Sequence, residues 1–221
     1  MFVGHYAAAF AAKTLEPRAK FWTYAGACQL VDIGWSALIM GGVEKMHANP
    51  SLPGGIDLYF MPYTHSLPGV AAWSIGAMAL SRLLLRLPWR AAVFVGLTAF
   101  SHWILDLLVH RPDLLLWFGG PKVGLSFWSY PIPEMALELG LVAVAGGAWI
   151  ATRKDAGLKA WPVIAFMGFL TALQMVASLS PNSDGAVTAG STALAVYLVA
   201  TGLAWLVERD DRAAPRALQA A

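Results

Sequence analysis

Charged residues are scarce in this sequence, and cysteine is nearly absent. Only 13% of its 221 residues are Asp, Glu, Lys or Arg and 58% are hydrophobic, whereas soluble domains carry roughly 25% charged residues. The net charge of +2 gives no strongly basic surface of the kind that binds nucleic acid. The single cysteine, Cys28, excludes an internal disulfide bond and a metal site built from cysteines. This composition is typical of a membrane protein.

Long apolar runs fill most of the chain. A helix needs about 20 mostly apolar residues to cross the hydrocarbon core of a bilayer, and its backbone hydrogen bonds must all be made within the segment. Six runs qualify, at residues 22–43, 66–87, 90–109, 134–152, 158–179 and 187–207. The sequence therefore predicts an all-α, polytopic membrane bundle of about six transmembrane helices. We expect residues 1–208 to form a single transmembrane domain and residues 209–221 a cytoplasmic tail.

Basic residues gather in alternate connections between these runs. They lie before the first run, between the second and third, between the fourth and fifth, and after the sixth: Lys13, Arg18 and Lys20; Arg82, Arg86 and Arg90; Arg153, Lys154 and Lys159; Arg209, Arg212 and Arg216. The other connections contain few basic residues. Because basic loops remain on the cytoplasmic side of a membrane, the alternation predicts a multi-pass protein with both termini in the cytoplasm.

The two longer outer connections, residues 44–65 and 110–133, can hold structure of their own. Both contain Gly and Pro turn signals. The second is also rich in aromatic residues: Trp117, Phe118, Phe127, Trp128 and Tyr130. These aromatics predict either a belt at the membrane interface or a lid that covers a site.

Few ionisable side chains lie inside the apolar runs, and each is a functional candidate because an unpaired polar group in hydrocarbon is costly. The expected topology places most of them in the outer half of the bundle and one near its middle: His65, His102, Asp106 and Glu138, and Asp32. Their levels in the membrane allow all five to converge on one polar pocket.

His102 and Asp106 are four residues apart in the third run. Residues at this spacing differ by about 40° in direction and about 6 Å in height on a helix, so both can reach one ion, as in helical zinc proteases. His110 is one step further, but the following Pro112 ends the helix. His110 is therefore a ligand of a second metal, a partner of the ligands, or an interfacial residue.

Imidazole and carboxylate groups together favour zinc and related divalent ions. His65 supplies a third ligand, and Asp32 or Glu138 completes the shell or serves as the general base for a water molecule. The alternative is structural, because His and Asp side chains can neutralise each other between packed helices.

Four motifs occur in a fixed order along the first half of the chain. They are GHYAAAFAAK (residues 4–13), Asp32 in the first run, THS (residues 64–66) and SHWILD (residues 101–106). Over residues 4–113 the chain resembles the bacterial membrane-bound metal-dependent hydrolase family, which is distantly similar to zinc-dependent phospholipase C. The resemblance implies a bacterial inner (plasma) membrane protein. It also implies five metal ligands: His5, Asp32, His65, His102 and Asp106.

The sequence thus favours a metal-dependent hydrolase acting on an ester or phosphodiester, with a divalent metal, zinc by first expectation, in the outer half of the bundle. We expect Glu138 and Asp32 to act in catalysis, and the partners to be membrane lipids and a small-molecule or lipid substrate, not nucleic acid. Two other functions use the same residues. Intramembrane Asp, His and Glu also form the ion and proton paths of transporters. In a non-catalytic membrane scaffold, the same side chains would only determine how the helices pack.

Overall fold

The computed structural model of the chain describes residues 1–52, 55–180, 185–209 and 211. Over these residues the protein is mostly helical. The α-helices are α1 (Tyr6–Leu15), α2 (Phe21–Cys28), α3 (Leu30–Met40), α4 (Leu67–Leu83), α5 (Trp89–Val109), α6 (Pro131–Asp155), α7 (Trp161–Leu179) and α8 (Ala186–Val207). Short 3-10 helices precede α1 at Val3–His5 and α6 at Phe127–Ser129.

Four of the helices, α5 to α8, are long and apolar enough to cross a membrane. They correspond to the predicted runs 90–109, 134–152, 158–179 and 187–207, so these four predictions are confirmed as candidate spans. The expectation of six is wrong for the first two runs. Run 66–87 forms α4, whose 17 residues extend only about 25 Å, less than the roughly 30 Å of a hydrocarbon core.

The first run, 22–43, is interrupted. Gln29, with φ −105° and ψ 4°, separates α2 from α3, so neither piece is long enough to span a bilayer. The interruption has a local consequence, because the last carbonyls of α2 and the first N–H groups of α3 lack partners within their own helices. Asp32 lies in the first turn of α3, where a carboxylate interacts favourably with the helix dipole.

Both outer connections contain short antiparallel ribbons, so the all-α prediction is incomplete. Strand β1 (Lys45–Ala48) pairs with β2 (Ile56–Phe60), and β3 (Leu114–Leu115) pairs with β4 (Lys122–Val123). A single bridge between Ser66 and Leu115 joins the start of α4 to the second ribbon. The two connections therefore meet at one end of the bundle.

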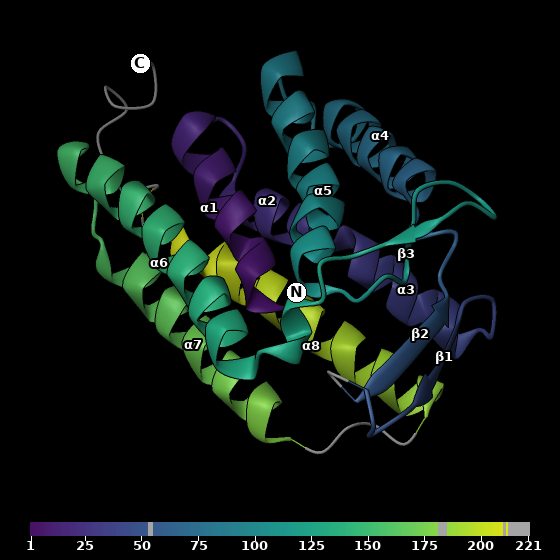
Figure 1. Cartoon of the computed structure of the whole chain (residues 1–221). Helices are drawn as coiled ribbons and strands as arrows, with labels where there is room; N and C mark the ends of the chain where they lie inside the picture. The colour runs from purple at the N-terminus through teal and green to yellow at the C-terminus, as the bar shows by residue number, and fades with distance from the viewer. Residues whose placement is uncertain (53–54, 181–184, 210, 212–221) are drawn as a thin grey trace.

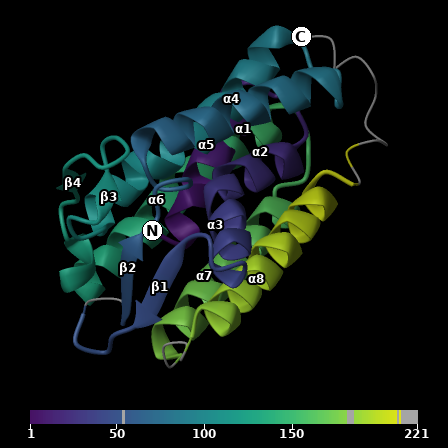
Figure 2. The same cartoon turned by 90° about the vertical axis from the view of Figure 1, so that its right-hand side faces the viewer.

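Helix α1 lies in the middle of the molecule, between α5 and α6 (Figure 1). Helix α4 packs on α5, and α2 and α3 both pack on α8, as the turned view also shows (Figure 2). The core of the bundle is aromatic: the rings of Phe10, Phe21, Trp149 and Phe166 contact one another with centroids 4.6 to 6.1 Å apart. These contacts join α1, α2, α6 and α7.

The end of the bundle opposite the ribbons holds paired basic residues. Lys13 Nζ lies 2.7 Å from Glu208 Oε1, and Arg90 Nε lies 3.2 Å from Glu16 Oε2. The hydrogen bonds that Arg18 donates to Glu16 hold the pKa of that carboxyl below its ordinary value. These pairs tie α1 to α5 and to the end of α8.

The first residues of the chain lie away from this basic end. Met1 is buried, and its amino nitrogen is 2.7 Å from Asp106 Oδ1. Glu208 instead pairs with Lys13 at the far end of α1, so Met1 and Glu208 lie toward opposite ends of the bundle. That both termini lie in the cytoplasm stays a prediction. Most of the predicted tail, 209–221, lies outside the described residues.

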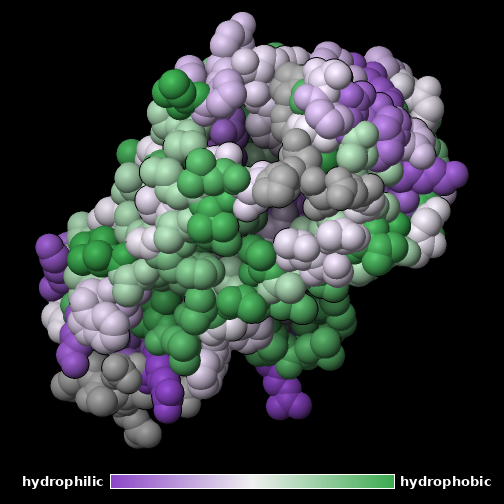
Figure 3. Space-filling view, turned by 90° about the horizontal axis from the view of Figure 1, so that it is seen from below, coloured by the Kyte–Doolittle hydropathy of each residue, from purple (hydrophilic) through white to green (hydrophobic). Residues whose placement is uncertain are grey.

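Apolar side chains are widely exposed on the helices. Seen from below the view of Figure 1, hydrophobic residues dominate the middle of the surface and hydrophilic ones gather toward its edges (Figure 3). Residues on the candidate spans contribute directly: Leu97, Val144, Ile164, Val176 and Leu198 are all more than half exposed. Such a surface is expected of helices that face lipid tails.

Candidate metal centre

Four separate segments carry the five side chains of one buried His/Asp cluster. His5 ends the first 3-10 helix, Asp32 lies in the first turn of α3, His65 precedes α4, and His102 and Asp106 lie on α5. Each of these five residues is at most 8% exposed. All five metal ligands implied by the family resemblance therefore lie close together. His110, which directly follows α5, joins them.

Asp106 is the centre of the cluster. Its Oδ2 atom lies 3.1 Å from His102 Nε2 and 3.6 Å from His65 Nε2. Its Oδ1 atom lies 3.2 Å from His5 Nε2 and 3.6 Å from His110 Nε2. Four imidazoles thus face one carboxylate.

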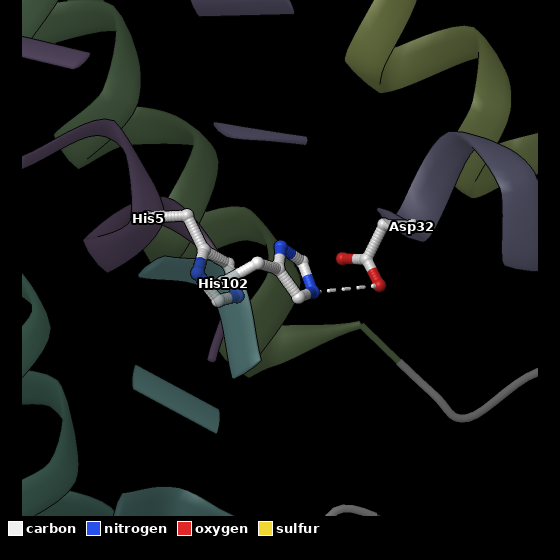
Figure 4. A group of neighbouring side chains, drawn as sticks. All are labelled: His5, Asp32 and His102. Carbon is white, nitrogen blue, oxygen red and sulfur yellow. Dashed lines mark ion pairs between the residues drawn. The ribbon is translucent and has the colours of Figure 1, made fainter. Parts of the chain in front are cut away.

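Asp32 approaches the same imidazoles from α3. Its Oδ1 atom lies 3.3 Å from His65 Nε2 and 3.4 Å from His102 Nε2, while its Oδ2 atom accepts a hydrogen bond of 2.8 Å from the Tyr197 hydroxyl. Figure 4 shows His102 between Asp32 and His5, whose ring stacks on that of His102 at 3.7 Å. The hydroxyl of Tyr197 fixes the carboxylate, so Oδ1 is held toward the imidazoles.

Two overlapping groups have the geometry of a metal site. In each group, one ligand atom from every residue lies within 4.8 Å of the others: His5, Asp32 and His102, and His65, His102 and Asp106. His102 belongs to both. The pair that the sequence placed four residues apart on one helix, His102 and Asp106, is thus part of the second group.

The histidines present the same ring nitrogen to the cluster. His102 Nδ1 donates to the carbonyl of Cys28 at 2.9 Å, and His110 Nδ1 donates to Asp113 Oδ1 at 2.8 Å. These bonds place a proton on Nδ1, so in the neutral ring the lone pair is on Nε2, the nitrogen that faces the carboxylates. A second bond of this kind is typical of metal-binding histidines, because it fixes the tautomer and the ring orientation.

His65 is oriented by a chain of hydrogen bonds. Its Nδ1 lies 2.8 Å from Thr64 Oγ1, and the Thr64 hydroxyl donates to Glu44 Oε2 at 2.6 Å. Since that hydroxyl proton goes to Glu44, Thr64 Oγ1 accepts from Nδ1 of His65. The carboxylate of Glu44 also accepts the backbone N–H groups of Tyr63 and Thr64, so the outer connection holds His65 in place.

Several buried atoms of the cluster have no hydrogen-bond partner within the described part of the chain. They include His5 Nε2, His102 Nε2 and Asp106 Oδ2. His102 Nε2 and Asp106 Oδ2 are 3.1 Å apart but are not aligned for a hydrogen bond. Buried polar atoms are seldom left unpaired. Lone pairs and carboxylate oxygens that face a common point are what a divalent cation requires, so the residues fit a metal.

The interruption at Gln29 explains how His102 is held. Cys28 is the last residue of α2, and its carbonyl is among those that no helix N–H can reach. That carbonyl accepts the proton of His102 Nδ1. The break thus supplies an acceptor for one proposed ligand and, at the start of α3, a position for another, Asp32.

The predicted catalytic residue Glu138 lies at the edge of the cluster. Its carboxylate accepts backbone N–H groups from Phe2 at 2.8 Å and from Gly4 at 2.8 Å. Glu138 thus fixes the segment that carries His5. The structure does not include Glu138 in either three-residue group, so its role as a base or ligand stays a prediction.

Sequence reasoning missed the residues that orient the histidines and Asp32 of the cluster. Asp113, Glu44 and Thr64 lie in the outer connections, where no helical spacing relates them to the histidines. Tyr197 lies on α8 and is far from Asp32 in the sequence. The one available signal was the HRPD motif, in which Asp113 follows His110 by three residues, a spacing at which a chain leaving a helix can fold back.

Comparisons with protein-family models, with curated proteins and with solved structures find no match to this chain. The family resemblance therefore rests on the motif residues alone. The structure supports a more general description than the family does. The chain is mostly helical, has four candidate membrane spans, and contains buried His/Asp groups that can hold a metal ion.

Proposed function

We propose that the protein is an integral membrane, metal-dependent hydrolase that cleaves an ester or phosphodiester. The observation that carries this proposal is that, within the described residues, His5 Nε2, His102 Nε2 and Asp106 Oδ2 are buried in one cluster without hydrogen-bond partners. His65 and Asp32 complete the proposed ligand set. Zinc is the first expectation because the donors are imidazole nitrogen and carboxylate oxygen.

When bound, the cation would polarise the scissile carbonyl or phosphoryl group and acidify a water molecule. The protein's own residues would do the rest. The Cys28 carbonyl and the Glu44–Thr64 pair keep the lone pairs of His102 and His65 directed inward. The Tyr197 hydroxyl keeps Asp32 Oδ1 beside both rings.

Proton transfer would use the residues at the rim of the ligand set. Asp32 and Glu138 are the predicted acid–base residues, and His110 joins them. Its Nδ1 proton is held by Asp113, so its Nε2 atom can accept a proton on the side that faces Asp106. Trp128 packs against the His110 ring, with centroids 4.1 Å apart, and limits the access of bulk water.

The distribution of polar groups argues against the transporter alternative. A transport path needs polar groups from one face of the membrane to the other. Between the cluster and the basic end, α1 and its neighbours instead pack the aromatic side chains of Phe10, Phe21, Trp149 and Phe166. The polar cluster is thus confined to one end of the bundle, as a hydrolytic site would be.

Elemental analysis of the purified protein tests the proposal. We expect stoichiometric divalent metal in the wild type and its loss in His102→Ala and Asp106→Asn, because both residues belong to the second ligand group. His47→Ala is the matched control, since His47 is exposed and pairs with Asp57 outside the cluster. This control should retain the wild-type metal content.

Thermal unfolding separates metal binding from a packing role. A bound ligand raises the stability of the native state, so a chelator should lower the melting temperature of the wild type and of His47→Ala but not of His102→Ala. Negligible metal in all the proteins, with no chelator effect, would instead support a scaffold and overturn the proposal.

A further inference from the structure

A hollow of about 450 Å³ lies between α1, α5 and α6. Its lining is almost wholly apolar: Ala7, Ala8 and Ala11 of α1; Leu97, Phe100, Ser101, Ile104 and Leu105 of α5; and Leu141, Val144 and Ala145 of α6. The three alanines create the space, because α1 presents only methyl groups to its larger neighbours. We call this hollow the lateral groove.

The lateral groove begins at the level of the His/Asp cluster. On α5, the lining residues Ser101 and Leu105 directly precede His102 and Asp106 in the sequence. On α1 and α6, the lining begins within about one turn of His5 and Glu138. His5 before α1, His102 and Asp106 on α5, and Glu138 on α6, at the edge of the cluster, therefore lie toward the same end of the groove.

From this level the groove runs away from the ribbons toward the middle of the bundle. On α5 its lining extends from Leu105 back to Leu97, and Leu97 lies about 13 Å along the helix axis from Asp106. On α6 it extends in the opposite chain direction, from Leu141 to Ala145. A molecule in the groove would thus have one end beside the cluster and its length along the spanning helices.

The groove opens onto the outer surface of the helix bundle. Leu97, Ile104 and Val144 are 57%, 47% and 76% exposed, and they lie on α5 and α6, both long enough to span a membrane. The hydroxyl of Ser101 donates to the Thr98 carbonyl at 2.7 Å, so it is not left for a polar ligand. The lining offers contacts to hydrocarbon and little to water.

We infer that the lateral groove holds one acyl chain of a membrane lipid, whose ester or phosphodiester linkage thereby reaches the His/Asp cluster. This inference rests on the proposed hydrolase function and narrows its substrate class to lipids that enter from the side. The groove selects the hydrocarbon part, and the cluster acts on the linkage at its end. The acyl chain of the substrate would stay at the level of the spanning helices, and only the head group and its linkage would enter the protein.

Photocrosslinking tests the inference directly. The purified full chain would be placed in nanodiscs of phosphatidylethanolamine and phosphatidylglycerol that contain a phosphatidylethanolamine with a diazirine in one acyl chain. We expect crosslinks concentrated on α5 and α6 residues of the groove, above those on Ile164 and Val176, which are equally exposed on α7. Uniform labelling around the bundle would overturn the inference.

Val144→Trp would fill the groove from its exposed rim, where the larger ring should not disturb folding. We expect groove labelling to fall about tenfold, since losing even a few methylene contacts changes binding by that factor. Val176→Trp is the matched control, because Val176 is 61% exposed on α7. Unchanged groove labelling in Val144→Trp would also contradict the inference.

The experiments distinguish a failure of the hydrolase proposal from a failure of the acyl-chain inference. Labelling concerns only hydrocarbon, so it should persist in His102→Ala, which should lose the metal. Groove labelling without any bound metal would support the acyl-chain site and contradict the proposed metal-dependent hydrolase. Bound metal with uniform labelling would support the metal centre and contradict the inference that the substrate is a lipid held in the groove.

Discussion

Three histidines of the cluster are each held by a group that does not itself face the cluster. For His102 this group is a backbone carbonyl, for His110 it is Asp113, and for His65 it is Thr64, which is held in turn by Glu44. Such partners set which nitrogen carries the proton and how basic the other becomes. The chemistry of the site is therefore sensitive to residues in the outer connections.

Thr64→Val removes the hydroxyl between His65 and Glu44 without changing the size of the side chain much. We expect metal affinity to fall about 10- to 100-fold, the usual effect of losing such a partner, because the Nδ1 proton of His65 loses its acceptor. Competition with a fluorescent chelator would measure the affinity.

Thr171→Val is the control for this change. Among the described residues, the Thr171 hydroxyl bonds to the Met167 carbonyl within α7 and to no residue of the cluster, so metal affinity should stay at the wild-type value. Equal affinities in Thr64→Val and the wild type would show that His65 is held by packing or does not bind the metal.

The sequence predicted single residues well where they lie on regular helices. His102 and Asp106 follow from helical spacing, which holds throughout α5. His110 does not, because its contact with Asp106 depends on the helix ending at Val109 and on the extended backbone of His110 itself. Spacing cannot predict how a chain leaves a helix.

Among the elements, the interrupted segment α2–α3 shows what hydropathy misses. The run 22–43 is apolar enough to be counted as one span, but average hydropathy does not register a change of backbone at one residue, Gln29. The ribbons in the outer connections were likewise not predicted, because the sequence indicated only turns there and, in the second connection, an interfacial belt or a lid. Segments that only tertiary contacts define remain hard to predict from composition.

Helix α3, which carries Asp32, packs closely on α8 at Gly190. A Cβ atom at Gly190 would lie 2.7 Å from the Ser36 carbonyl oxygen and 2.7 Å from Met40 Cγ. Because the carbonyl is backbone, Gly190→Ala should push the two helices apart and destabilise the protein by about 1–3 kcal/mol, as overpacking does. Thermal unfolding in detergent would measure the loss.

Gly202→Ala provides the comparison within the same helix. Within the described part of the chain, and apart from the backbone of its own helix turn, no atom lies within 4 Å of a Cβ placed at Gly202, so the substitution should be neutral or stabilise the helix by up to about 1 kcal/mol. A similar loss of stability in both variants would mean that the α3–α8 contact is not as close as described.

At the scale of the whole molecule, the protein has two chemically different ends. One holds the His/Asp cluster and the ribbons, and the other holds the basic residues that pair with Glu16 and Glu208. If basic segments face the cytoplasm, the cluster lies toward the opposite side of the membrane.

Cysteine labelling tests this orientation, since Cys28 is the only cysteine and is buried. In a Cys28→Ala background, single cysteines would replace the exposed residues Ser51 and Ser129 near the ribbons, or Lys20 and Lys159 at the basic end. We expect a membrane-impermeant maleimide to label the first pair in intact spheroplasts and the second pair only after permeabilisation. The reverse pattern would invert the predicted topology.

The lateral groove also bears on how the protein must be extracted. A surfactant with a single alkyl tail resembles the inferred acyl chain and would occupy the same space between α1, α5 and α6. Micelles would therefore supply a competitor at very high concentration, and longer tails should inhibit more strongly because each added methylene contributes about 0.8 kcal/mol. Polymer-bounded discs, which retain native lipids around α5 and α6, avoid this inhibition.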